Sequence, residues 1–481
     1  MKNERNNSED QSVEIEFLGM EFGLPELLYF FGFVALSSFL FTFQLLDTDP
    51  YIKFFSWQKS ITNVVALGAT LICTLLYLSI RKSDELSERR MRIFVSLITI
   101  LIFLTVKGAD LVSLYLVPVA FGTALIAIFM DFETALSLNA VFAISVAVQA
   151  GFTGYLGPVI VAFVGGLVGI LGAKEIRKSF DLTRIGISVG LVNMILIFAF
   201  RLPSMISPSW SRLDWSVYAW GGTNGLIAAL FIAGAIPLAE FLTQRTSPIG
   251  LMELLNPSHP LLERLREEAP GTYHHSKNIA SLGENAARAI GADPLLTAVG
   301  GYYHDIGKMV RPEFFIENQD PDSNPHDDLT PTMSKIVLTS HLKQGTDLGR
   351  SYGLKEDILH FIPTHHGTSV IRYFYLKALR EQSGETDLAK EEFRYEAELP
   401  DTKETSIIAL ADSVEAASHG LQDVRTREVE DMIEDEIENK IQEGQLAESP
   451  LTMADIKTIK AEFADTIRAM SHNRISSFPP E

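Results

Sequence analysis

The sequence has little cysteine, and this excludes two kinds of site. Its 481 residues include a single cysteine, Cys73, which lies inside an apolar run. One thiol cannot form a disulfide within the chain or build a metal site from several thiolates. The polar, acidic N-terminus, MKNERNNSEDQSVEIEF, also lacks the basic start and small-residue cleavage site of a secretory signal. We therefore expect the first apolar run to remain as an anchor, and the soluble part to face a reducing compartment.

The second half of the chain lacks the basic excess that binding of long nucleic acid requires. Residues 246–481 carry 23 Lys/Arg and 41 Asp/Glu, whereas residues 1–245 carry 17 and 19. An acidic surface of this kind excludes long nucleic acid as a partner. A small phosphate-bearing substrate remains compatible with it, because bound metal ions supply local positive charge.

The first half is short of charge over long stretches, and these stretches predict membrane spans. A bilayer crossing needs about 20 apolar residues. Eight runs approach or reach this length, at residues 24–46, 60–80, 91–107, 111–130, 134–153, 157–173, 185–200 and 217–239. The ionisable residues Asp110, Asp131 and Glu133 fall in the short loops between predicted spans, so the half is typical of an anchor or sensor rather than a transporter.

Basic residues in the loops predict the orientation of these spans. One set of loops, with the N-terminal tail, holds twelve Lys/Arg, and the other set holds five. The richer side is expected to be cytoplasmic, and with eight spans it contains both termini. We therefore predict a cytoplasmic tail at residues 1–23, a transmembrane domain at 24–239, a connecting segment at 240–258 and a cytoplasmic domain at 259–481.

Histidine is absent from residues 1–245, while ten of the eleven histidines lie between His259 and His419. Seven groups in this half follow the order H, HD, H, HH, D, namely His275, His304, Asp305, His341, His365, His366 and Asp412. Imidazole and carboxylate together are typical ligands of divalent transition metals, and seven are too many for one ion. The pattern predicts a two-metal hydrolase centred on the adjacent His304-Asp305 pair.

The predicted elements around these residues are helices, so the soluble half is expected to be all-α. His275 lies four residues before Ile279, on the apolar face of a helix that starts near Thr272 and ends at Gly291. His304 and Asp305 are expected near the end of a second helix that Gly307 closes. Asp412 interrupts a largely apolar helix, where a bare carboxylate is costly unless it is paired or metal-bound.

Other polar residues in this half have less specific interpretations. Lys308 is expected beyond the metals, either as a cation for a phosphate oxygen or as a partner of the helix dipole. His274, His360 and His419 are interpreted as surface or structural residues. Residues 380–405 are expected to form an exposed loop, and the apolar spacing in residues 422–471 predicts core packing.

Residues 259–420 resemble the HD-domain metal-dependent phosphohydrolases. The motifs APGTYHHS, HDIGKMVRPEFFIENQ, NPHDDLTP and HHGT, the last followed by YFY, are similar to those of the bacterial seven-transmembrane-HD proteins. The resemblance implies a multi-pass protein of the bacterial inner membrane that hydrolyses cyclic di-AMP to pApA, and it leaves a homo-oligomer open. It also implies two iron or manganese ions, one held by His275, His304, Asp305 and Asp412 and the other by Asp305, His341, His365 and His366. Asp305 and Lys308 would act in catalysis.

The chain departs from that family at one place, and alternatives to its activity remain open. A large extracellular domain usually follows the first span, but here only DTDPYIKFFSWQK occupies that position. Cyclic di-GMP hydrolysis by the HD-GYP class is disfavoured because GTSVIRYFYLKALR, after the His-His pair, lacks a Gly-Tyr-Pro element. A nucleoside triphosphate or alarmone hydrolase is disfavoured by the predicted spans, and a non-catalytic nucleotide receptor is disfavoured by the complete ligand set.

Overall fold

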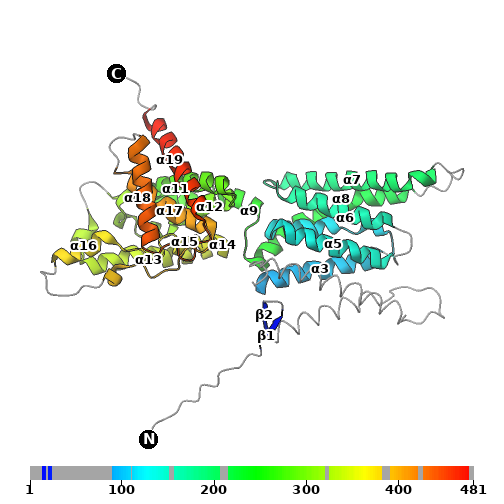
Figure 1. The fold of residues 1–481 in the computed structure, drawn as a ribbon, viewed down its shortest axis with the longest axis horizontal. Coiled ribbons are helices and arrows are strands. Elements are labelled where there is room, and N and C mark those ends of the chain that lie inside the picture. Colours follow the sequence, from blue (N-terminus) through cyan, green and yellow to red (C-terminus); the bar gives the residue numbers. More distant parts are fainter. Residues whose placement is uncertain are drawn as a thin grey trace, which may run out of the picture. The chain divides into compact units, whose positions relative to one another are not determined.

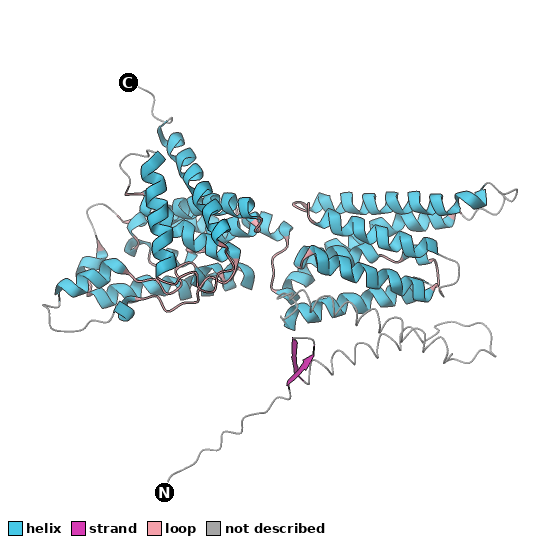
Figure 2. Ribbon diagram, viewed as in Figure 1, coloured by secondary structure: helices cyan, strands magenta, loops and turns pink. Residues whose placement is uncertain are grey.

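The chain was examined as a computed structural model, which describes residues 14–17, 20–23, 89–109, 111–150, 156–205, 215–319, 324–381, 390–420 and 426–475. It divides into two compact units, Met1–Thr243 and Gln244–Glu481. The described elements are almost all helices, so the predicted all-α fold class is confirmed (Figures 1 and 2). The one exception among named elements is a hairpin of β1 (Glu14–Phe17) and β2 (Met20–Gly23), in which Glu14 pairs with Gly23.

Within its described residues, the first unit contains five helices that are long and apolar enough to cross a membrane. They are α3 (Arg89–Ala109), α5 (Phe132–Gln149), α6 (Leu156–Ala173), α7 (Ser179–Met205) and α8 (Ser216–Thr243). Each corresponds to one predicted span. The predicted spans at residues 24–46 and 60–80 lie outside the described residues.

The predicted span at residues 111–130 takes a different form. It consists of the 3-10 turn η2 (Leu114–Leu116) and the short helix α4 (Val119–Phe129). Pro118 lies between them and, with no amide hydrogen, cannot continue a helix from η2 into α4. Together η2 and α4 make one shorter apolar stretch, Leu114–Phe129, so residues 111–130 remain a predicted span in two pieces.

Close backbone packing joins α7 and α8. A Cβ atom on Gly225 would come within 2.4 Å of the Gly190 amide nitrogen, and one on Gly190 would lie 2.6 Å from the Gly222 carbonyl oxygen. Glycines allow this approach, as they do between helices in lipid. On the outer faces of the same helices, large apolar side chains are exposed, including Leu230 at 71% and Leu238 at 60%. Such surfaces are typical of helices that contact lipid rather than water.

The second unit is a helical domain that carries all the histidines among the described residues. Its α-helices are α9 (Pro248–Leu254), α10 (Pro260–Glu268), α11 (Pro270–Ile290), α12 (Pro294–Tyr303), α13 (Pro331–Ser351), α14 (Glu356–Leu359), α15 (Phe361–Thr364), α16 (Arg372–Glu381), α17 (Lys403–Ser418), α18 (Thr426–Gln442) and α19 (Met453–Ile475). The 3-10 helices are η4 (Ile306–Val310), η5 (Pro312–Phe314), η6 (Ile316–Asn318), η7 (Pro325–Asp328) and η8 (Lys390–Phe393).

Two apolar cores hold this domain together. The larger core joins α11 and α17 to α18 and α19 through buried residues such as Ile408, Ile433 and Phe463. The predicted core packing of residues 422–471 is therefore confirmed. The smaller core joins α9, α10, α12 and α14 around Tyr303 and Ile358. Helices α11 and α12 contact each other and both contact α17, which brings the histidine-bearing segments together.

Candidate metal centre

His275 enters the site from the first half of α11. This helix has Pro270 at its first turn and ends at Gly291, whose φ of 71° is a left-handed cap that favours glycine. Ile279, four residues after His275, is fully buried. The shared face therefore directs the imidazole inward, and the side chain of His275 is only 11% exposed.

His304 and Asp305 lie at a junction rather than on the second helix as expected. Helix α12 ends at Tyr303, His304 caps it, and Asp305 precedes the 3-10 helix η4. The backbone turns here because Gly307 packs directly on α13, where an added Cβ would lie 2.6 Å from the Gly345 amide nitrogen. The turn buries both side chains, with 0% exposure for His304 and 1% for Asp305.

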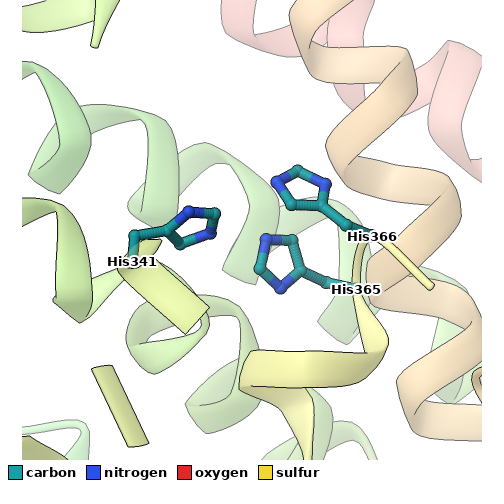
Figure 3. Close-up of side chains that lie close together, drawn as sticks. All are labelled: His341, His365 and His366. Carbon is teal, nitrogen blue, oxygen red and sulfur yellow. The ribbon is translucent and has the colours of Figure 1, made fainter. Parts of the chain in front are cut away.

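Three further histidines come from the next part of the domain. His341 projects from the middle of α13, while His365 and His366 directly follow α15 (Figure 3). The rings of His365 and His366 are 3.9 Å apart between centroids, and that of His341 lies 5.3 Å from His366. The doublet and His341 therefore form one compact group, in which one nitrogen of each ring lies within 4.8 Å of those of the others.

Asp412 completes the cluster from α17. This helix begins with a capping box between Thr402 and Thr405 and is largely buried beyond it. Asp412 is 13% exposed, and its Oδ1 lies 3.2 Å from His275 Nε2. Its Oδ2 lies 3.5 Å from His366 Nδ1. The seven sequence-predicted ligands, which span 138 positions from His275 to Asp412, are thus brought together in space.

Asp305 lies at the centre of this arrangement. Its Oδ2 is 3.5 Å from His275 Nε2 and 3.2 Å from His304 Nε2. Its Oδ1 is 3.4 Å from His341 Nε2 and 3.5 Å from His365 Nε2. Each oxygen of the Asp305 carboxylate therefore faces a different pair of histidines.

Six buried atoms that face the centre make no hydrogen bond, although Asp305 Oδ2 also forms an ion pair with Lys308. Two of these buried atoms are the carboxylate oxygens of Asp305. The other four are the Nε2 atoms of His275, His304, His341 and His365. Unsatisfied buried polar atoms are costly, and six that converge on one point need a common partner. Imidazole nitrogens and carboxylate oxygens at this spacing fit divalent metal ions.

The outward nitrogens of the same histidines are all satisfied. His275 Nδ1 donates to Glu415 Oε2 at 2.7 Å. The Nδ1 atoms of the other three donate to main-chain oxygens: His304 to Gly301 at 2.8 Å, His341 to Leu338 at 2.5 Å and His365 to Ile362 at 2.7 Å. Donation from Nδ1 leaves the Nε2 lone pair directed inward, which is the tautomer required of a metal ligand.

Burial and nearby charges also set the protonation states of the ligand side chains in the metal-free protein. Burial lowers the pKa of His304 and His366, and it lowers the pKa of His341 to about 4, so these rings are neutral near pH 7. Burial alone would favour the protonated carboxyl of Asp305, but Lys308 and His304 hold its pKa well below the usual range. Burial opposes a charge on His275 as well, yet the neighbouring carboxylates of Asp305, Asp412 and Glu415 raise its pKa well above the usual value.

Lys308 is already engaged by two carboxylates. Its Nζ lies 2.7 Å from Asp305 Oδ2 and 2.9 Å from Glu317 Oε1. Burial disfavours the ammonium, but Asp305 and Glu317 outweigh this and raise the pKa of Lys308. The cation therefore acts as a counter-ion within the cluster, and its predicted contact with a phosphate oxygen stays a prediction.

The sequence reasoning did not single out two residues that contact the ligands. Glu415 accepts hydrogen bonds from His275 and from Asn278 Nδ2, the latter at 2.8 Å. Its position three residues after Asp412 on an apolar helix was a usable signal, because that spacing places both carboxylates on one face. The Tyr395 ring stacks on His366 with centroids 4.2 Å apart. Its position in a charged segment carried no such signal.

The remaining histidines agree with their predicted surface or structural roles. His274 is exposed. His360 Nε2 lies 2.7 Å from Asp401 Oδ1, which ties the start of α15 to the segment before α17. His419 is exposed and contacts Glu415 at 3.2 Å, behind the ligand cluster rather than within it.

Both units match known protein families. Residues 59–247 match the family described as a 7TM receptor with an intracellular HD hydrolase. Residues 272–417, which include all seven predicted ligands, match the HD domain. Together with the five long apolar helices among the described residues, these matches indicate a multi-pass membrane protein that carries an HD domain.

Several relatives share both parts. The cyclic-di-AMP phosphodiesterase PgpH of Bacillus subtilis (strain 168) is 34% identical over 87% of this chain and 60% of its own. PgpH of Listeria monocytogenes serotype 1/2a (strain 10403S) is 32% identical over 90% of this chain and 60% of its own. The chain thus spans about 60% of the length of these relatives. A crystal structure of the L. monocytogenes PgpH HD domain in complex with cyclic-di-AMP is 39% identical, with a TM-score of 0.43, and covers 45% of this chain and 99% of that one.

Proposed function

We propose that this protein is a membrane-anchored, metal-dependent phosphodiesterase that hydrolyses cyclic di-AMP to the linear product pApA. The observation that carries the proposal is the convergence, around Asp305, of six buried nitrogen and oxygen atoms that make no hydrogen bond. The substrate is supported by the two PgpH relatives, whose names state cyclic-di-AMP phosphodiesterase activity. The matched HD domain supports the hydrolase class.

The ligand roles follow the two sides of the cluster. We assign one ion to His275, His304, Asp305 and Asp412, and the other to Asp305, His341, His365 and His366. The split of Asp305 contacts between its two oxygens supports this assignment. A set of five imidazoles and two carboxylates is compatible with iron or manganese, which we propose as the native metals.

Two bound ions would supply an activated hydroxide nucleophile and positive charge for the phosphate oxygens. The chain's own residues prepare the site for that chemistry. Burial of the rings keeps His341 and His366 neutral, so that they offer lone pairs. Lys308, which is itself paired with Glu317, helps to hold Asp305 in place through Oδ2. His366 and Asp412 are among the more exposed ligands, at 18% and 13%, and so mark the side from which a substrate approaches.

We also propose that the hydrolase domain, residues 259–481, faces the cytoplasm of a bacterial inner membrane. The twelve-to-five distribution of basic residues between the two sets of loops supports this orientation. A contact within the bundle agrees with it: Lys174 Nζ, after α6, lies 4.2 Å from the centroid of the Phe132 ring at the start of α5. The loops that hold these residues are therefore at one end of the bundle, as the predicted topology requires.

Product analysis of the purified full-length protein tests the activity. The protein would be loaded separately with manganese and with iron, then incubated with cyclic di-AMP or cyclic di-GMP. We expect selective conversion of cyclic di-AMP to pApA. Preference for cyclic di-GMP would refute the substrate, and no product from either substrate with two metals bound would favour a nucleotide receptor.

Substitution of Asp305 tests the mechanism. Because both halves of the cluster share this carboxylate, Asp305→Ala should abolish turnover and most metal binding. Asp347→Ala removes an exposed carboxylate of α13 and is the matched control, expected to behave as wild type. Substantial hydrolysis by the Asp305→Ala protein would rule the shared-carboxylate mechanism out.

A further inference from the structure

Lys440 occupies a position on α18 where an apolar side chain is expected. Val429, Ile433 and Ile437 recur at four-residue intervals and are 0–1% exposed in the larger core. Lys440 follows Ile437 by three residues, so it continues the same inward face of the helix. Burial lowers the pKa of this lysine, and Asp412 is the foremost group that opposes the shift. A partly buried lysine therefore lies on the inward face of α18, close enough to Asp412 for the two charges to interact.

The direct contact of Lys440 is neutral. Its Nζ donates to Ser369 Oγ at 3.0 Å. Within the described residues, no carboxylate lies within 4.0 Å of this nitrogen, whereas Lys308 has two such partners. An ammonium with three donors and one hydroxyl acceptor retains both charge and hydrogen-bonding capacity.

Ser369 places this cation on the side of the candidate metal centre where His366 and Asp412 are partly exposed. It belongs to the loop that directly follows the His365-His366 doublet, and its amide donates to the His366 carbonyl oxygen at 3.1 Å. His365 is fully buried, whereas the neighbouring His366 and Asp412 are partly exposed. Gln445, which is 2% exposed, fixes the same loop by accepting a hydrogen bond from the Thr368 amide at 2.9 Å.

From this placement we infer that Lys440 and Ser369 form a subsite for the phosphate of the cyclic dinucleotide that is not being cleaved. The inference rests on the proposed function. A cyclic dinucleotide carries two phosphodiesters in one ring, so when one lies at the metal centre the other remains close to it. A charge-assisted hydrogen bond from an ammonium is suited to that second phosphate. Lys440 is therefore a substrate-binding residue for the intact ring rather than a metal ligand.

The test compares three variants of the full-length protein with wild type, by steady-state hydrolysis of cyclic di-AMP and by metal content. Lys440→Met keeps the length of the side chain and removes its charge. We expect its KM to rise at least about tenfold, equivalent to about 1.4 kcal/mol, with kcat changed much less and both metals retained. Lys440→Arg should recover most of the lost affinity. Lys460→Met is the control, since Lys460 pairs with Glu434 on the surface at 2.8 Å, and it should match wild type.

Two results would overturn the inference. An unchanged KM in Lys440→Met would show that the ammonium does not reach the substrate. A joint loss of kcat and metal content, not rescued by arginine, would show that Lys440 only supports the loop behind His366. Wild-type protein that fails to hydrolyse cyclic di-AMP would instead refute the proposed function, and this inference with it.

Discussion

At the scale of single residues, the geometry of the candidate metal centre depends on the ligand side chains and also on the groups that orient them. Each of four histidines has one nitrogen directed at Asp305 and the other bonded outward. Three of the outward bonds go to main-chain oxygens of the same segment, so a side-chain substitution cannot remove them. The fourth, from His275 to Glu415, is the one that mutation can test.

Glu415→Gln should weaken metal binding. The change keeps the shape of the side chain but removes the negative charge that accepts from His275 Nδ1, and losses of this kind typically cost about 10–100-fold in metal affinity. Metal affinity measured by competition with a chelator would report the change. Glu404→Gln, the same substitution at the start of α17, is the matched control. Equal affinities in the two variants would contradict a role for Glu415 in orienting His275.

Acidification should destabilise the metal-free protein. Burial lowers the pKa of His341 from its usual 6.5 to about 4. Between these two values the unfolded chain binds more protons than the folded one, so the free energy of unfolding decreases as pH falls from about 6.5 to about 4. His304 and His366 shift in the same direction, whereas His275 shifts in the opposite direction and partly offsets them.

Thermal unfolding of the metal-free protein between pH 7.5 and pH 5 would measure this effect. We expect the melting temperature to fall with pH. His341→Leu should flatten the dependence, and His274→Leu, at an exposed position, should leave it unchanged. A melting temperature that rises on acidification would mean that His275 dominates.

At the scale of elements, the site depends on how closely η4 approaches α13. Gly307 in η4 lies so near this helix that an added Cβ would overlap the carbonyl oxygen of His341. The same contact connects the turn that carries Asp305 to the helix that carries His341. Close backbone packing, rather than any side chain, therefore sets the separation of these two ligands.

Gly307→Ala should disrupt both stability and metal binding. The methyl group can be accommodated only if η4 and α13 move apart, and overpacking of this kind costs about 1–3 kcal/mol. Denaturant unfolding and metal analysis would detect the two effects. Gly420→Ala is the control, because its Cβ would meet only the Ala417 carbonyl oxygen at 3.4 Å, an ordinary contact. Wild-type metal content in Gly307→Ala would show that the turn tolerates displacement.

At the scale of the whole molecule, the hydrolase unit has the features of an independent domain. Gln244–Glu481 forms its own compact unit with two buried cores, and every predicted ligand lies inside it. The segment that enters this unit is also fixed to it, since Thr246 donates to Asp357 through its amide at 2.6 Å and its hydroxyl at 2.9 Å.

A fragment of residues 244–481 should therefore fold, bind two metals and hydrolyse cyclic di-AMP without the membrane unit. Circular dichroism, metal analysis and product chromatography would test each point against the full-length protein. A folded fragment with two metals but no turnover would show that the membrane unit is required for catalysis. An insoluble fragment would contradict its independence.

The sequence by itself determined the class of the fold and the set of residues that we propose as metal ligands. Five long apolar helices, the buried faces of α18 and α19 and the ordered set of histidines and aspartates follow from residue type and local spacing. Local spacing was weakest at the end of α12, where the turn after Tyr303 placed His304 and Asp305 beyond the helix. Pro118 divides the apolar stretch predicted at residues 111–130 into η2 and α4.

Only the tertiary structure decided which oxygen of Asp305 faces which histidine, and that Lys308 is neutralised by Asp305 and Glu317. It also decided that Glu415 orients His275 and that Lys440 lies beside the loop after His366. These relations join residues that are mostly far apart along the chain. Spacing within one element determines the face on which a side chain lies, but the partner on that face depends on how separate helices pack together.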